Sequence, residues 1–254
     1  MEKWFTTAMI QDLPKQTILY MAARLLKSFF LRNRALPGRH MIEIYYEESM
    51  SFPLSEIASR HGTDKGGTSI NSTNIHAYTD FYFLLLCGRR FEPLSILECG
   101  IGSTDSTIPS NMGTNGRVGA SLRMWKEFFP KAEIIGLDVD PKTMFSEPRI
   151  RTFITNQLEP VELRILLRNL KRKYDLIIDD GLHSFESIKN MLLISFDFLG
   201  ENGVYVAEDL DLELISELSK ILGSNERYKH HYFINFRDKN YRDQGGWLLV
   251  IHKY

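Results

Sequence analysis

Acidic residues stand at the ends of four apolar runs of the chain. The seven carboxyl groups at these positions are Glu98, Asp138, Asp140, Asp179, Asp180, Glu208 and Asp209. A carboxylate can accept hydrogen bonds from ligand hydroxyls, bind a divalent cation or take part in proton transfer. One acid after a strand is ordinarily a turn or helix cap. Four run ends of the same kind favour a ligand site instead.

Asp180, Glu208 and Asp209 are suited to holding a metal ion. Ligands that are all oxygen favour Mg²⁺, or another oxygen-preferring divalent metal, over Zn²⁺ or Cu²⁺. The ion would also offset the repulsion among three acids brought together. Because Mg²⁺ retains several waters, two hydroxyls of a ligand could replace them and be activated for attack.

His183 follows Asp180 by three residues. This spacing is one helical turn if a helix begins at Gly181. Imidazole accepts a proton readily near neutral pH, so His183 is predicted to be the general base that acts beside Asp180.

The run before Gly100 ends in E-C-G-I-G (98–102), whose glycines permit close approach of the backbone to a ligand. The third glycine of the full dinucleotide fingerprint is missing, and so is a P-loop. Asp138 is suited to gripping a ribose diol. It comes 38 residues after Gly100, because Ser103–Val118 forms a long polar insertion.

Seven apolar runs, separated by helical stretches, could position these residues. They are Ser95–Cys99, Ala132–Leu137, Arg151–Thr155, Tyr174–Ile178, Gly203–Ala207, His231–Phe236 and Trp247–His252. This pattern predicts an α/β fold with a mostly parallel seven-stranded sheet, helices on both faces and an antiparallel C-terminal strand. Ligands bind beyond the carboxyl ends of such strands, so the acids are expected along one edge.

Residues 1–52 are predicted to be a helical extension, and 53–254 the main domain. Gln16–Phe30 reads as an amphipathic basic helix for packing or dimerisation, with membrane-surface binding as the alternative. This run is not predicted to span a membrane, because Arg24 and Lys27 interrupt it and a spanning helix needs about 20 mostly apolar residues. Met41–Tyr46 fits either a helix or a strand. The expected assembly is a homo-oligomer formed through the extension.

The composition narrows the function classes. The 254 residues include 31 Lys plus Arg and 32 Asp plus Glu, a formal net charge of −1. A chain so balanced has no global basic field, and no nucleic-acid partner is expected. The two cysteines, Cys87 and Cys99, make no disulfide framework, which indicates a reducing compartment and a cytoplasmic location.

Three segments resemble the core of class I S-adenosylmethionine-dependent methyltransferases, which have a Rossmann-like sheet. They are E-C-G-I-G (98–102), G-A-S-L-R-M-W (119–125) and I-I-G-L-D-V-D (134–140). Three others are similar to the metal-dependent sugar O-methyltransferases of the macrocin and mycinamicin type: H-G-T-D-K-G (61–66), I-I-D-D-G-L-H (177–183) and V-A-E-D-L (206–210). The chain departs from that family at Leu182, where the family commonly has Ser, and in the insertion 103–118.

The resemblance implies roles for individual residues. Gly100 and Gly102 would approach the methionine part of the cofactor, and Glu98 would help to hold its amino end. Ser121, at a helix start, could offer backbone N–H groups to a carboxylate.

For the rest of the cofactor, the resemblance implies Asp138 with Asp140 at the ribose, Asn156 and Gln157 at the adenine, and Asp179 below the sulfonium. The metal ligands would be Asp180, Glu208 and Asp209. The residues expected to close over the ligands are His61, Asp64, Lys65, His76 and Tyr78.

The expected function is metal-assisted transfer of a methyl group from S-adenosylmethionine to a hydroxyl of a sugar or of a glycosylated or nucleotide-linked small molecule, in natural-product or surface-glycan biosynthesis. Alternatives are a Mg²⁺-dependent methyltransferase of a catechol, an NAD-dependent oxidoreductase, and a catalytically silent dimeric binding protein. The missing third glycine and the acid trio count against the oxidoreductase. The presence of both His183 and the acids counts against the silent protein.

Overall fold

The computed structural model describes residues 41–46, 52–66, 76–238 and 246–253. Its nine strands are β1 Met41–Tyr46, β2 Ser95–Cys99, β3 Glu133–Asp138, β4 Ser146–Glu147, β5 Ile150–Ile154, β6 Tyr174–Asp179, β7 Leu199–Leu210, β8 His231–Asp238 and β9 Trp247–His252. They form one mixed sheet in the order β1-β8-β9-β7-β6-β2-β3-β5-β4.

The centre of the sheet is parallel, from β5 through β3, β2 and β6 to β7. Only β9 runs against both of its neighbours, β7 and β8, so the predicted antiparallel C-terminal strand is confirmed for the described sheet. The predicted count of seven strands is too low. β4 has two residues, too few for a periodic signal, and β1 pairs in parallel with β8, far along the chain.

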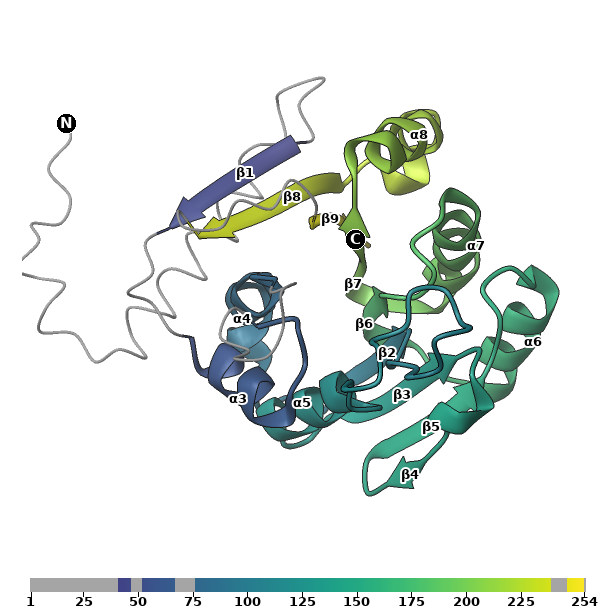
Figure 1. Ribbon diagram of the computed structural model, residues 1–254. Coiled ribbons are helices and arrows are strands. Elements are labelled where there is room, and N and C mark those ends of the chain that lie inside the picture. Colours follow the sequence, from purple (N-terminus) through teal and green to yellow (C-terminus); the bar gives the residue numbers. More distant parts are fainter. Residues whose placement is uncertain (1–40, 47–51, 67–75, 239–245, 254) are drawn as a thin grey trace, which may run out of the picture.

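Helices cover both faces of the sheet, as predicted (Figure 1). One face carries α3 Pro53–His61, α4 Tyr78–Leu86 and α5 Ala120–Phe128, and the other carries α6 Pro160–Leu170, α7 Phe185–Ser195 and α8 Leu212–Gly223. Short 3-10 helices are η1 Cys87–Arg89, η2 Pro141–Thr143, η3 Phe196–Phe198 and η4 Glu226–Tyr228.

Successive strand residues face opposite layers. Ile96 packs with the α3–α5 layer and its neighbour Leu97 with the α6–α8 layer. Because both faces are covered, the central strands read as continuous apolar runs in the sequence.

The predicted helix Gln16–Phe30 lies outside the described residues. Among the described residues, no helix is long and apolar enough to cross a membrane.

The ends of β2 and β6 lie very close together. The Asp180 backbone N–H donates to the Cys99 carbonyl at 2.8 Å. The chain then turns at Gly100 with φ +86°, and a Cβ atom there would lie 1.9 Å from the Asp180 carbonyl oxygen. The glycine is therefore required for the fold itself, because the two strand ends leave no room for a side chain.

We expect Gly100→Ala to lower the free energy of unfolding by more than about 2 kcal/mol, since it combines a backbone clash with a left-handed φ. Urea denaturation of the purified variant measures this change. Gly88→Ala is the matched control, because its Cβ would meet nothing within 4 Å, and it should change stability by less than about 0.5 kcal/mol. Equal midpoints for the two variants would contradict the close contact of β2 and β6.

Candidate functional site

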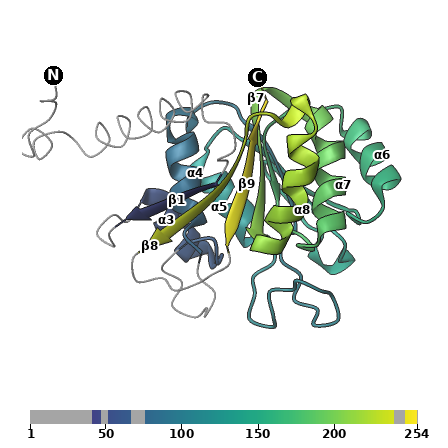
Figure 2. The ribbon, with the colours of Figure 1, turned by 90° about the horizontal axis from the view of Figure 1, so that it is seen from above.

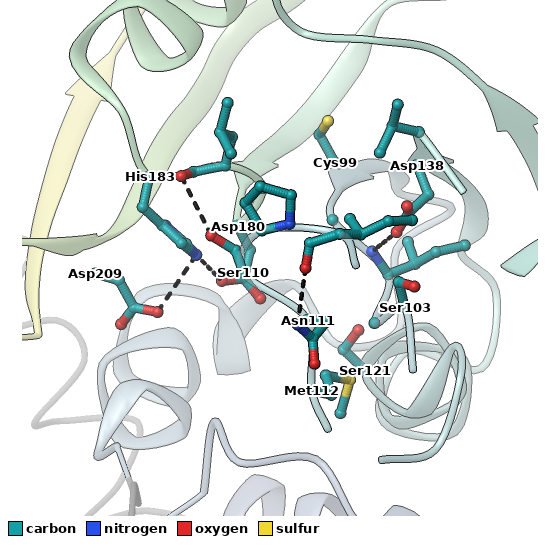
Figure 3. Close-up of a pocket in the computed structure, with 18 of the residues that line it drawn as sticks. Cys99, Ser103, Ser110, Asn111, Met112, Ser121, Asp138, Asp180, His183 and Asp209 are labelled. Carbon is teal, nitrogen blue, oxygen red and sulfur yellow. Dashed lines mark hydrogen bonds and ion pairs between the residues drawn. The ribbon is translucent and has the colours of Figure 1, made fainter. Parts of the chain in front are cut away.

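A cavity of about 470 Å³ lies at the carboxyl ends of the central strands (Figure 3). Its volume is within the range of ligand pockets, about 300–1,000 Å³. Its lining residues at or just after strand ends include Gly100, Asp138, Asn156, Asp180 and Asp209. The predicted edge of the sheet therefore carries the site.

Asp180, His183 and Asp209 converge at one end of this cavity (Figure 3). His183 Nε2 lies 3.7 Å from Asp180 Oδ1 and 3.7 Å from Asp209 Oδ2. One ligand atom from each of the three side chains lies within 4.8 Å of the others. Two carboxylates and an imidazole at this separation fit a divalent cation.

The backbone of the cluster is strained at two positions. His183 has φ 54° and Asp209 has φ 58°, in the left-handed region that non-glycine residues seldom adopt. The expectation of a helix that begins at Gly181 is wrong. α7 begins at Phe185 because Ser184 caps it, its hydroxyl accepting from the Ser187 backbone N–H. The left-handed backbone at His183, rather than a helical turn, therefore brings its imidazole near Asp180.

Glu208, the third predicted metal ligand, lies behind the cavity wall and is 1% exposed. Both of its carboxylate oxygens have partners: Tyr82 donates to Oε1 at 2.6 Å and Lys65 to Oε2 at 2.6 Å. Burial raises the pKa of Glu208 well above its usual value, although the Lys65 charge opposes this. The neighbouring Asp209 faces the cavity instead.

Lys65 lies at the centre of the buried acids. It also donates to Asp180, and its Nζ lies 3.6 Å from Glu98 Oε1. Burial acts to lower the pKa of Lys65, but Asp180, Glu208 and Glu98 outweigh it and raise the pKa above its usual value. Lys65 is therefore a buried ammonium ion. The sequence predicted it only among the residues that close over the ligands.

The pKa values of the two cavity-facing acids move in opposite directions. Burial, with some repulsion from Asp209, raises the pKa of Asp180 to about 7, although Lys65 opposes the rise. Burial acts to raise the pKa of Asp209 as well, but His76, His183 and the hydrogen bond from Tyr78 outweigh it and lower the pKa. The acids exceed the nearby ammonium in number, so a divalent cation would stabilise the cluster.

Helix α4 supports both acids at the end of β7. Tyr78 donates to Asp209 Oδ1 at 2.5 Å, and Tyr82 donates to Glu208. The two tyrosines are four residues apart and so share one face of the helix.

Asp138 lies toward the other end of the cavity (Figure 3). Its carboxylate accepts from the Ile101 and Asp140 backbone N–H groups, each at 2.9 Å, and retains lone pairs for a ligand. The nearby Thr155 hydroxyl is buried and has no hydrogen-bond partner among the described residues. Asp140 does not line the cavity; it accepts from Ser103 Oγ at 2.5 Å.

The remaining predicted cofactor residues divide into two groups. Those that line the cavity are Gly100, Gly102, Ser121, Asn156 and Gln157. Glu98 and Asp179 lie beneath it and are fully buried.

These two acids are held by side chains of the protein. Trp125 Nε1 donates to Glu98 at 2.6 Å. Gln157 and Tyr205 donate to Asp179 at 2.5 and 2.8 Å. Burial raises the pKa of Asp179 to about 6, although these two hydrogen bonds oppose the rise.

The insertion 103–118 also lines the cavity, a role that sequence reasoning missed. Its lining residues are Ser103, Ile108, Pro109, Ser110, Asn111 and Met112. Figure 2 shows this loop extending away from the body of the protein. Ser110 Oγ donates to the Leu182 carbonyl at 3.2 Å, which ties the insertion to the segment that carries His183. The sequence signal for this role was the position of the insertion directly after E-C-G-I-G, the loop predicted to approach the ligand.

Comparison with known proteins finds similar methyltransferases. No family model matches the chain. The chain is 33% identical over 157 residues to the 8-demethyl-8-alpha-L-rhamnosyl tetracenomycin-C 2'-O-methyltransferase of Streptomyces olivaceus, an alignment that covers 62% of the chain and 37% of that relative. It is 34% identical to the demethylmacrocin O-methyltransferase of Streptomyces fradiae, over 62% of the chain and 36% of the relative. The chain thus spans well under half the length of these curated relatives.

A solved structure extends the comparison. The mycinamycin-pathway methyltransferase MycE, in complex with Mg, SAH and mycinamycin VI, has a TM-score of 0.59 and 25% identity to the chain. The match covers 81% of the chain and 56% of MycE. The fold is the Rossmann-like α/β fold of methyltransferases, and the resemblance to the macrocin- and mycinamicin-type sugar O-methyltransferases is confirmed.

We expect Tyr82→Phe to destabilise the protein by about 1–3 kcal/mol, because it leaves a buried Glu208 oxygen without its donor. Tyr174→Phe is the matched control: the Tyr174 hydroxyl is buried without a hydrogen-bond partner among the described residues, so its loss should cost less than about 0.5 kcal/mol. Urea denaturation of both variants makes the comparison. Equal losses would show that the Tyr82 hydroxyl does not support Glu208.

Proposed function

We propose that this chain is a metal-assisted O-methyltransferase, which moves a methyl group from S-adenosylmethionine to a hydroxyl of a sugar or of a glycosylated or nucleotide-linked small molecule. The observation that carries the proposal is a single cavity with Asp138 toward one end and the Asp180–His183–Asp209 cluster at the other (Figure 3). The names of the curated relatives and the Mg and SAH bound to MycE support it.

In this proposal the cofactor lies along the glycine-containing loop after β2. Gly100 and Gly102 approach its methionine part, and Ser121 lies at the helix start beside them. Asp138 accepts from the ribose hydroxyls, since its two oxygens match a vicinal diol. Asn156 and Gln157 contact the adenine. Glu98, Asp140 and Asp179 act from behind the cavity wall, through the side chains and loops that they hold.

Asp180 and Asp209, which face the cavity, would hold the metal ion together with Glu208, the third predicted ligand. A divalent ion supplies a Lewis acid that lowers the pKa of an acceptor hydroxyl. Oxygen donors fit Mg²⁺ or a similar hard cation.

His183 is the proposed general base, and Asp180 holds its imidazole in place. The acceptor oxygen attacks the methyl carbon of the sulfonium, so that an O–C bond forms and the S–C bond breaks. The proton of the hydroxyl passes to His183, and the sulfur leaves as a neutral thioether. Much of the rate gain comes from holding the two reactants in line.

The wider organisation is part of the same proposal. Residues 53–254 form the methyltransferase domain, and the extension 1–52 adds β1 to the sheet edge beside β8. Dimerisation through the rest of the extension stays a prediction. A role in natural-product or surface-glycan biosynthesis and the absence of a nucleic-acid partner also stay predictions. The free thiols of Cys87 and Cys99 support a reducing, cytoplasmic location.

We expect S-adenosylhomocysteine to bind the purified protein with micromolar affinity in calorimetry, and NAD not to bind. Asp138→Asn should weaken that binding by about tenfold or more, because it removes a charged hydrogen-bond acceptor. NAD binding without S-adenosylhomocysteine binding would favour an oxidoreductase. Binding of neither ligand, with or without Mg²⁺, would contradict the proposal and favour a silent protein.

We expect His183→Ala to lower kcat by about 10²–10⁴-fold, as loss of a general base does, while the affinity for S-adenosylhomocysteine stays unchanged. A screen of sugar-containing and catechol acceptors with methyl-labelled cofactor supplies the assay. Methylation of a catechol instead of a sugar would favour the alternative acceptor class. Asp180→Asn should remove the increase in activity on addition of Mg²⁺, because it removes a proposed metal ligand. The control is His61→Ala: the sequence predicted His61 to close over the ligands, but it lies outside the cavity, where it contacts Glu127. Full activity of His183→Ala would rule out its role as base.

A further inference from the structure

Lys65 is 2% exposed and lies among buried carboxylates. Its ammonium donates to Asp180 and, at 2.6 Å, to Glu208 Oε2. The surrounding loop fixes its backbone: the Lys65 carbonyl accepts from the Thr79 backbone N–H at 3.0 Å. The ammonium therefore bridges two of the three residues predicted to hold the metal.

Both Glu208 oxygens already accept hydrogen bonds, from Tyr82 and Lys65, so a divalent ion bound by both Asp180 and Glu208 would lie close to the Lys65 ammonium. Like charges also repel strongly at this distance in a buried site. The ammonium and the metal ion therefore cannot both keep these contacts.

Glu98 offers the ammonium a second position. Its Oε2 is held by Trp125, which leaves Oε1 facing Lys65 at 3.6 Å. That oxygen is buried and has no hydrogen-bond partner among the described residues. Since the lysine side chain is flexible, a small swing would bring the ammonium to hydrogen-bond distance from Glu98.

We propose that Lys65 is an internal cation that competes with the metal ion, bridging Asp180 and Glu208 when the metal is absent and turning to Glu98 when it binds. The inference rests on the proposed metal site. Lys65 thereby keeps the acidic cluster paired without metal, and it weakens metal binding by the energy needed to displace it. It is a positioning residue that makes the metal exchangeable.

Metal affinity tests the proposal directly. In calorimetry with Mg²⁺ and Mn²⁺ on chelator-treated protein, Lys65→Met should bind the metal at least about tenfold more tightly than the unchanged protein, since it removes the competing charge. Its thermal midpoint should be lower without metal and should rise more on metal addition. Lys189→Met is the control, because it removes the same charge from a surface pair with Glu186, and its metal affinity should be unchanged.

A second measurement does not depend on the folding of Lys65→Met. In protein labelled with ¹⁵N-lysine, the Lys65 ammonium resonance, assigned by its loss in Lys65→Arg, should shift as Mg²⁺ saturates the site. S-adenosylhomocysteine binding in the same samples separates the two proposals. If the unchanged protein binds neither that ligand nor a metal, the proposed function fails. If it binds both, an unshifted resonance, or equal or weaker metal binding by a folded Lys65→Met, overturns the competition.

Discussion

A carboxylate that leaves water needs hydrogen-bond donors or a cation inside the protein. Here β2, β3, β6 and β7 each bury at least one acid at their carboxyl ends. Trp125 supplies a donor to Glu98, two backbone N–H groups serve Asp138, and Tyr82 with Lys65 serves Glu208. The helices and loops around the strand ends must therefore present these donors to the acids.

The two helical layers contribute unequally to this task. α4 supplies Tyr78 and Tyr82, α5 supplies Trp125, and the loop after α3 supplies Lys65, so the α3–α5 layer supplies most of the donors to the acids around Asp180 and Asp209. Of the other layer, α6 and α8 mainly pack an apolar core against the sheet. Lys65, Tyr78 and Tyr82, which come before β2 in the chain, thus support acids that lie in β2 and after it.

The sequence predicted the parts that depend on local pattern. Apolar runs located the central strands, and the acids after them located the edge that carries the cavity. The D-D-G-L-H segment placed Asp180 and His183 together, although the helix expected between them begins later because Ser184 caps it. Pairings that depend on distant residues left no such signal. Lys65 meets Asp180 across 115 positions of the chain, and β1 pairs with β8.

The insertion illustrates the same limit. Its polar composition indicated a loop, but its contribution to the cavity depends on contacts with separate parts of the chain. Asp140 accepts from Ser103 at its start, and Ser110 contacts the Leu182 carbonyl. Loop composition alone does not specify such partners.

The left-handed backbone at His183 also bears on how the protein could change over evolutionary time. Asn and Gly adopt that conformation more readily than most other residues do. A replacement of His183 by glycine would relieve strain while removing the proposed base, so selection for stability and selection for catalysis oppose each other at this position. Where methylation is no longer selected for, a single substitution at His183 would give a protein that is more stable but inactive.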